Sequence, residues 1–180
     1  LVTKDGLEEL EDRRSLLFVG RLPKIVSLTR TFLGSGLELA DFIHIDAGAW
    51  YLARLRPAPA TVHPTAACVH LEQIAPPEGM TARELDVLTL LAAGCSNDNI
   101  AARLAVSPRT VAKHVEHLSA KLGVWSRSQM AGLALDCGLL HLPVPGGADG
   151  LTLAPFRLDQ AETALSWQAT RSRQQPILRP

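Results

Sequence analysis

The chain has 180 residues, with 18 lysines and arginines balanced by 18 aspartates and glutamates, so its formal net charge is zero. This length allows one or two domains with a hydrophobic core, but the neutral charge excludes binding to nucleic acid through domain-wide basicity. No apolar run approaches the ~20 residues that cross a bilayer. Three widely spaced cysteines fit reduced thiols better than a disulfide framework or a zinc site. We therefore expect a cytoplasmic protein without a membrane partner, metal or cofactor.

Residues 1–76 predict a small α+β segment. A run of mixed charge at 7–17, LEELEDRRSLL, is typical of a helix, and a second helix is expected near 23–33. WYLARLR (50–56) and ACVHLEQI (67–74) have strand-like composition, and the Pro-rich segment between them predicts a hairpin. Because an isolated pair of strands is marginally stable, this hairpin must pack on helices or on further strands.

Two prolines in the segment 75–79 indicate a stiff linker to the next domain. We expect three parts in all: an α+β segment at 1–76, a helical domain at 77–142, and a C-terminal tail at 143–180. In the tail, residues 159–174 could form a short amphipathic helix. Its basic end is more typical of a solvated terminus than of a binding site.

Residues 81–123 predict three short helices joined by tight turns. Thr81 and Glu84 have the spacing of a capping box, in which each side chain satisfies the backbone N–H of the other residue. The remaining boundaries carry residues that commonly begin or end helices: Gly94, Ser96, Ser107 with Pro108, and Gly123. A helix, a short turn and a second helix form the arrangement that places a recognition helix in the major groove of DNA.

The third helix, at about 108–122, separates its residues into two faces. An apolar stripe recurs at helical spacing and is expected to face the core: Val111, Val115, Leu118 and Leu122. The opposite face carries mostly polar and small residues: Arg109, Lys113, Glu116, His117 and Ala120, with Ala112 at its edge. Such a polar face could also be merely solvated. The capped boundaries and the small alanines favour close approach to DNA.

The stretch SNDNIAARLAVSPRTVAKHVEHLSAKLGV, followed by SRSQMAGLAL, resembles the LuxR-type (GerE-like) helix-turn-helix domain of bacterial transcription regulators. The resemblance covers about residues 79–142. It implies a mainly α fold, in which a C-terminal four-helix bundle binds double-stranded DNA as a dimer, often through its fourth helix, here about 127–137. The preceding segment loosely resembles the last part of PAS-like or GAF-like sensory domains, so we expect a fragment of a longer regulator or one that lost its upstream sensor.

The resemblance assigns six residues to positions that face the groove or the phosphates: Arg109, Thr110, Ala112, Lys113, Glu116 and His117. By their chemistry, Lys113 can bind guanine or a phosphate, and Glu116 can accept a hydrogen bond from cytosine. Arg109, Lys121 and Arg127 are expected to contact phosphates, which position the protein without specifying sequence. Many family members carry a basic residue where this chain has Ala112, and some carry one where it has Glu116. The resemblance therefore does not identify the DNA sequence that this chain binds.

The charge distribution is locally basic. Residues 81–142 contain six basic and five acidic residues, a net charge of +1, whereas residues 103–127 contain five basic residues and one acidic residue, a net charge of +4. The positive charge therefore gathers on the proposed DNA-binding face. This distribution predicts a modest number of phosphate contacts and an affinity that falls with salt.

The function expected from these features is sequence-specific DNA binding by a transcription regulator that occupies a promoter. The alternative is a module that resembles region four of sigma factors and acts with RNA polymerase. An enzyme is not expected, because the chain lacks G-x-S-x-G, P-loop and H-E-x-x-H motifs, and no catalytic residue is assigned. The operator, the signal and the choice between activation and repression are not encoded in these motifs.

Overall fold

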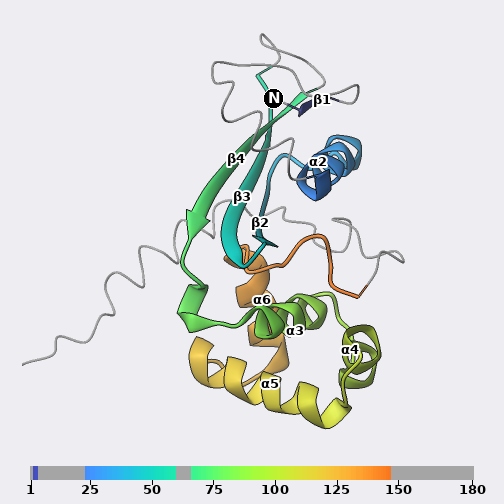
Figure 1. The fold of residues 1–180 in the computed structure, drawn as a ribbon, viewed down its shortest axis with the longest axis vertical. Helices are drawn as coiled ribbons and strands as arrows, with labels where there is room; N and C mark the ends of the chain where they lie inside the picture. Colours follow the sequence, from blue (N-terminus) through green and yellow to red (C-terminus); the bar gives the residue numbers. More distant parts are fainter. Residues whose placement is uncertain (1, 4–22, 60–65, 147–180) are drawn as a thin grey trace, which may run out of the picture.

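The computed structural model describes residues 2–3, 23–59 and 66–146. They form a sheet with one covering helix, and a bundle of four helices below it (Figure 1). The fold is thus mainly helical with a small antiparallel sheet, as the sequence predicts. The helices expected at 7–17 and 159–174 lie outside the described residues. Among the helices that are described, none is both long and apolar enough to span a membrane.

The sheet contains β1 (Val2–Thr3), β2 (Ala40–Asp46), β3 (Ala49–Pro57) and β4 (Ala66–Ile74), in the order β1-β4-β3-β2. The two predicted strands are confirmed as β3 and β4, which pair antiparallel as the predicted hairpin. β2 was not predicted. Its sequence, ADFIHID, lacks a clear alternation because three consecutive residues from Phe42 are buried. A two-residue turn at Ala47 and Gly48, both with positive φ, joins β2 to β3.

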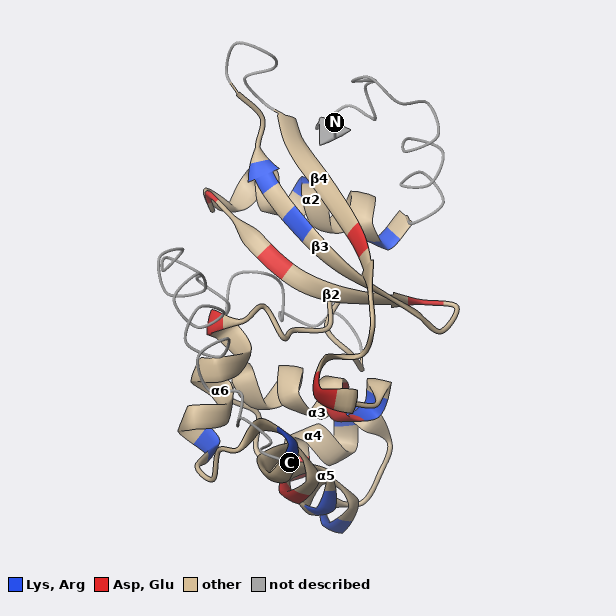
Figure 2. Cartoon of the chain, turned by 90° about the vertical axis from the view of Figure 1, so that its left-hand side faces the viewer, with Lys and Arg blue, Asp and Glu red and all other residues tan. Residues whose placement is uncertain are grey.

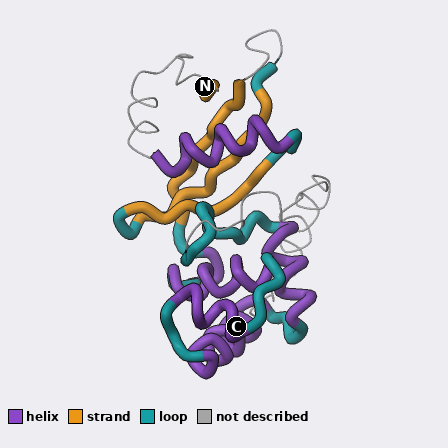
Figure 3. Tube along the Cα trace, turned by 90° about the vertical axis from the view of Figure 1, so that its right-hand side faces the viewer, coloured by secondary structure: helices purple, strands orange, loops and turns teal. Residues whose placement is uncertain are grey.

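Helix α2 (Pro23–Ser35) confirms the helix predicted near 23–33 and crosses the strands on one face of the sheet (Figure 3). Pro23 suits the first helical position, where no backbone N–H is needed. The helix buries Ile25, Thr29 and Phe32 in the same hydrophobic core as Phe42 and Leu55 of the sheet. The hairpin therefore gains the packing partners that it needs for stability.

The helical bundle follows a short 3-10 turn, η1 (Pro77–Gly79), and consists of α3 (Ala82–Ala92), α4 (Asn97–Leu104), α5 (Pro108–Leu122) and α6 (Arg127–Asp136). The predicted capping box at Thr81 is present, and the N-caps at Ser96 and Ser107 and the left-handed C-cap at Gly123 are also confirmed. Gly94 lies one residue beyond the C-cap of α3, which is Ala93.

The bundle core fixes the orientation of α5. Val111 and Leu118 are fully buried, while Val115 and Leu122 of the predicted stripe are half-buried at its edges. They pack with buried residues of the other helices: Leu85, Leu88, Ile100, Met130 and Ala134. Because this apolar seam faces inward, the opposite side of α5 must face outward.

The chain after α6 returns to the sheet, which the sequence did not predict. Leu139, Leu140, Leu142 and Val144 are buried, and His141 forms an isolated parallel bridge with Ile43 of β2. In Figure 1 this orange segment runs beside the lower end of the sheet toward α4. It crosses the boundary that the sequence placed at residue 142.

Candidate nucleic-acid interface

The outward face of α5 is open to solvent. Arg109, Thr110, Lys113, Glu116 and His117 are exposed, and Ala112 is half-exposed. Figure 2 shows α5, with its charged residues, at the end of the molecule opposite the sheet. No described part of the chain covers this face.

Three charged residues on this face have no partner within the described part of the chain. Among the described residues, Arg109, Lys113 and Glu116 make no ion pair or side-chain hydrogen bond. They are therefore available to bases or phosphates, whose donors and acceptors they can match. Ala112 places no bulky group between them.

The N-terminus of α5 is ordered by its cap. Ser107 accepts a hydrogen bond from the backbone N–H of Thr110 at 3.1 Å, and the two hydroxyl oxygens lie 2.8 Å apart. Thr110 thus takes part in the cap while its side chain remains exposed. Pro108 has no backbone N–H, and that of Thr110 donates to Ser107. Of the first three residues of α5, only Arg109 therefore has a backbone N–H without an acceptor among the described residues, and such a group can bind a phosphate oxygen.

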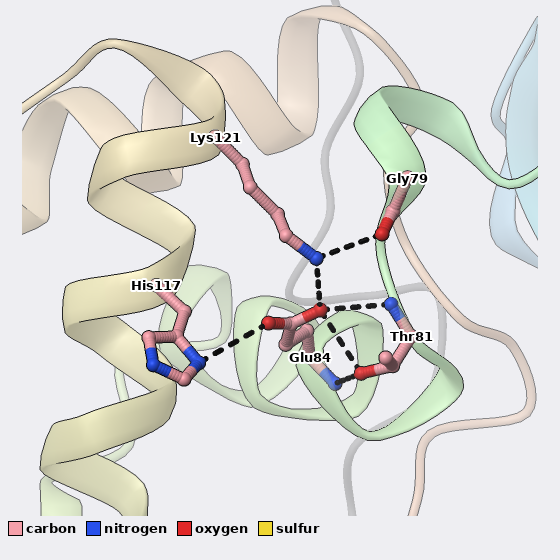
Figure 4. A network of polar contacts seen from close by, with 5 residues as sticks. All are labelled: Gly79, Thr81, Glu84, His117 and Lys121. Atoms are coloured by element: carbon pink, nitrogen blue, oxygen red, sulfur yellow. Dashed lines mark hydrogen bonds and ion pairs between the residues drawn. The ribbon is translucent and has the colours of Figure 1, made fainter.

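Near its C-terminus α5 is held by a polar network around Glu84 (Figure 4). Lys121 Nζ donates to Glu84 Oε2 and to the carbonyl oxygen of Gly79, both at 2.7 Å. Thr81 donates to the same carboxylate oxygen from its backbone N–H at 2.8 Å and from its hydroxyl at 3.0 Å. His117 Nδ1 lies 3.6 Å from the other oxygen. One carboxylate thereby joins the linker, α3 and α5.

These contacts keep Glu84 ionised although its side chain is only 5% exposed. Burial alone would raise the pKa of Glu84, but hydrogen bonds from Lys121 and Thr81 outweigh that effect and lower the pKa to about 2. The negative charge of Glu84 balances Lys121. Sequence reasoning identified the capping role of Glu84 but missed its contact with α5, because the two residues are far apart in the chain.

The two other predicted phosphate contacts are also engaged within the protein. Lys121 is occupied as just described. Arg127 Nη1 donates to Asn97 Oδ1 at 3.3 Å, and Arg127 Nη2 donates to the carbonyl oxygen of Cys95. These bonds join the start of α6 to the first residue of α4 and to the turn before it. Arg127 nevertheless remains exposed, and the phosphate contacts of both residues stay predictions.

Comparisons with known proteins agree with this geometry. Residues 78–134 match the family described as bacterial regulatory proteins, luxR family. Mb0914c of Mycobacterium bovis, which is named as an HTH-type transcriptional regulator, is 53% identical over 59 residues, or 33% of this chain and 7% of that protein. The transcriptional activator protein ExaE of Pseudomonas putida is 37% identical over 65 residues, or 36% of this chain and 30% of that protein.

The chain thus spans less than a third of the length of these curated relatives. Among solved structures, one of the Vibrio cholerae VqmA dimer is 23% identical, with a TM-score of 0.34, over 69% of this chain and 66% of that chain. The matched family and its named relatives are transcription regulators, which are typically not enzymes.

Proposed function

We propose that the chain acts as a sequence-specific transcription regulator through residues 78–134, which match the luxR family of bacterial regulatory proteins. In this proposal α5 enters the major groove of a promoter site. The observation that carries it is the exposed outer face of α5, where Arg109, Lys113 and Glu116 have no partner among the described residues. The match to the LuxR family does not favour the sigma-factor alternative or a partnership with RNA polymerase.

The residues of α5 divide into two roles. Lys113 and Glu116 lie about one and two turns into the helix and read bases, with guanine O6 or N7 and cytosine N4 as their natural partners. Arg109 and Thr110 lie near the helix N-terminus, where their side chains and the backbone N–H of Arg109 bind a phosphate. Ala112 allows close approach, and His117 borders the groove beside Glu84.

Lys121 retains a donor for DNA. An ammonium group has three N–H donors, and Glu84 and Gly79 take two of them. The side chain is 29% exposed, so its third donor can bind a phosphate at the edge of the interface. In this arrangement Lys121 both holds α5 on α3 and contributes to the affinity for DNA.

The test is a selection of bound duplexes from random DNA by the full chain. The proposal requires an enriched motif and a higher affinity for that motif than for scrambled DNA. If the folded protein enriched no motif at low salt, the proposal of sequence-specific DNA binding would be wrong.

We expect Arg127→Ala to weaken binding to all duplexes alike. The negative slope of log affinity against log salt should become shallower by about 1. The reason is that a phosphate contact carries no sequence information. Asn97→Ala is the matched control, because it removes a partner of Arg127 but keeps the charge. Binding titrations at several salt concentrations measure both. An equal slope in Arg127→Ala and the wild type would contradict the phosphate contact.

We further propose that two copies associate through α6. This helix carries half-exposed small and apolar residues, Ala131, Gly132, Leu133 and Leu135, and the turn before it holds Trp125, which is 81% exposed. A two-fold dimer would match two half-sites about one helical turn apart. The sheet and α2 keep the expected role of a sensory segment.

Leu133→Glu is expected to shift the chain toward the monomer, because a charge at the centre of this surface would lose its hydration on association. Sedimentation velocity measures the distribution. Thr31→Glu adds the same charge on the exposed side of α2 and should leave it unchanged. A wild-type protein that is monomeric both free and on a two-half-site duplex would exclude this surface as a dimer contact.

A further inference from the structure

The segment after α6, residues 138–146, is here called the strap. It extends the sheet at the free edge of β2. Ile43 N donates to the carbonyl oxygen of Leu140 at 2.7 Å, and Leu142 N donates to the carbonyl oxygen of Ile43 at 3.0 Å. His44 Nδ1 lies 3.0 Å from the carbonyl oxygen of Leu142. Because a carbonyl only accepts, His44 Nδ1 must carry the hydrogen.

The same strap binds the helical bundle from its other side. His141 N donates to Thr89 Oγ1, and His141 Nδ1 contacts Asp86 Oδ1, both at 2.7 Å. Thr89 is fully buried and Asp86 nearly so, with 15% of its side chain exposed. The backbone of the strap therefore pairs with β2 while its central residue is bonded to α3.

The strap is also continuous with α6. Gly138 N and Leu139 N donate to carbonyl oxygens in the last turns of that helix, at 3.3 Å and 2.8 Å. Gly138 has a φ of 63°, and a Cβ atom on it would lie 3.1 Å from the backbone oxygen of Asp41 in β2. No flexible spacer separates α6 from the sheet, so movement of one must displace the other.

We propose that the strap joins the sheet and the DNA-binding helices into one cooperative folding unit, through which stabilisation of either part reaches the other. The physical basis is linkage: when two parts open together, a change in the stability of one alters the opening of both by the same factor. A ligand of the sheet would then stabilise the DNA-binding bundle, and DNA would stabilise the sheet. The inference goes beyond DNA binding and does not depend on it.

The experiment is amide hydrogen exchange on the full chain without DNA. Ile100→Val removes one methyl group from a fully buried position in α4 and should speed exchange in the bundle by about 2- to 12-fold. If the strap couples the parts, the amides of β2 and β3 that exchange most slowly should speed up by the same factor. Unchanged exchange in these strands would overturn the proposal.

Two variants of the strap test whether the strap transmits the effect of Ile100→Val from the bundle to the sheet. Combined with Gly138→Ala, Ile100→Val should affect the bundle and leave β2 and β3 unaffected. Gly34→Ala in α2 is the matched control, since the space around Gly34 is open, and should preserve the shared response. If Gly138→Ala fails to fold, His141→Ala replaces it: the backbone bonds to β2 remain and the Asp86 contact is lost, so the transmitted factor should fall. If Ile100→Val still sped exchange in β2 and β3 by the full factor in the folded strap variants, the strap would not be the element that couples the two parts.

Discussion

Glu84→Gln should lower the free energy of unfolding by about 1.5 to 3 kcal/mol, the usual value of hydrogen bonds to a charged group. The substitution keeps the size of the side chain but removes its charge. Lys121 would lose its ion pair, and the capping box at Thr81 would keep a weaker neutral acceptor. Urea unfolding followed by circular dichroism measures the difference. Because the same carboxylate holds α5, DNA affinity should fall as well.

The pH dependence of the free energy of unfolding tests whether the charge of Glu84 is responsible. The pKa of Glu84 is lowered from 4.5 to about 2, so its contribution to stability is complete above pH 4.5 and is lost as the pH falls toward 2. The difference in stability between wild type and Glu84→Gln should therefore shrink with acidification in that interval. Glu72→Gln is the control, because its ion pair with Arg54 is exposed and contributes little. A difference that stays constant with pH would show that the charge of Glu84 does not stabilise the fold.

Lys113→Ala should reduce affinity for the selected motif by about 1 to 3 kcal/mol, the usual value of one well-placed base contact. It should also relax the preference at a single base pair. The side chain of Lys113 on α5 is exposed and has no partner among the described residues, so the stability of the fold should not change. Competition binding against a set of single-base variants of the motif measures both effects.

Lys24→Ala provides the matched control for this experiment. Lys24 is an exposed lysine on α2, so the variant loses the same charge far from the proposed interface. It should bind as the wild type does at moderate salt, because charges separated by more than a Debye length are largely screened. If Lys113→Ala left both affinity and preference untouched, the assignment of the reading face would be wrong.

The helix boundaries of the bundle could be predicted because they depend on local chemistry. A capping serine or threonine acts within three residues of itself, and such signals at Thr81, Ser96 and Ser107 are legible without tertiary context. The outward position of Lys113 follows from the apolar seam on the other side of the same helix.

Long-range contacts could not be predicted in this way. The bond from Lys121 to Glu84 and the bonds from Arg127 to the start of α4 and the turn before it join positions separated by 30 residues or more. The sequence shows these residues only as cations suited to phosphate. β2 escaped prediction because Phe42, Ile43 and His44 are buried in succession, which removes the alternation of a half-buried strand.

The pairing of the strap with β2 bears on how this protein can be divided. A fragment that ends at β4 would leave the backbone N–H and carbonyl of Ile43 unpaired on an outer strand. Unprotected outer strands pair readily with other chains, so such a fragment should aggregate. A fragment that ends at 142 would discard buried Val144. Recombinant pieces that are cut at residue 146 or beyond should therefore stay dispersed at concentrations where shorter ones precipitate.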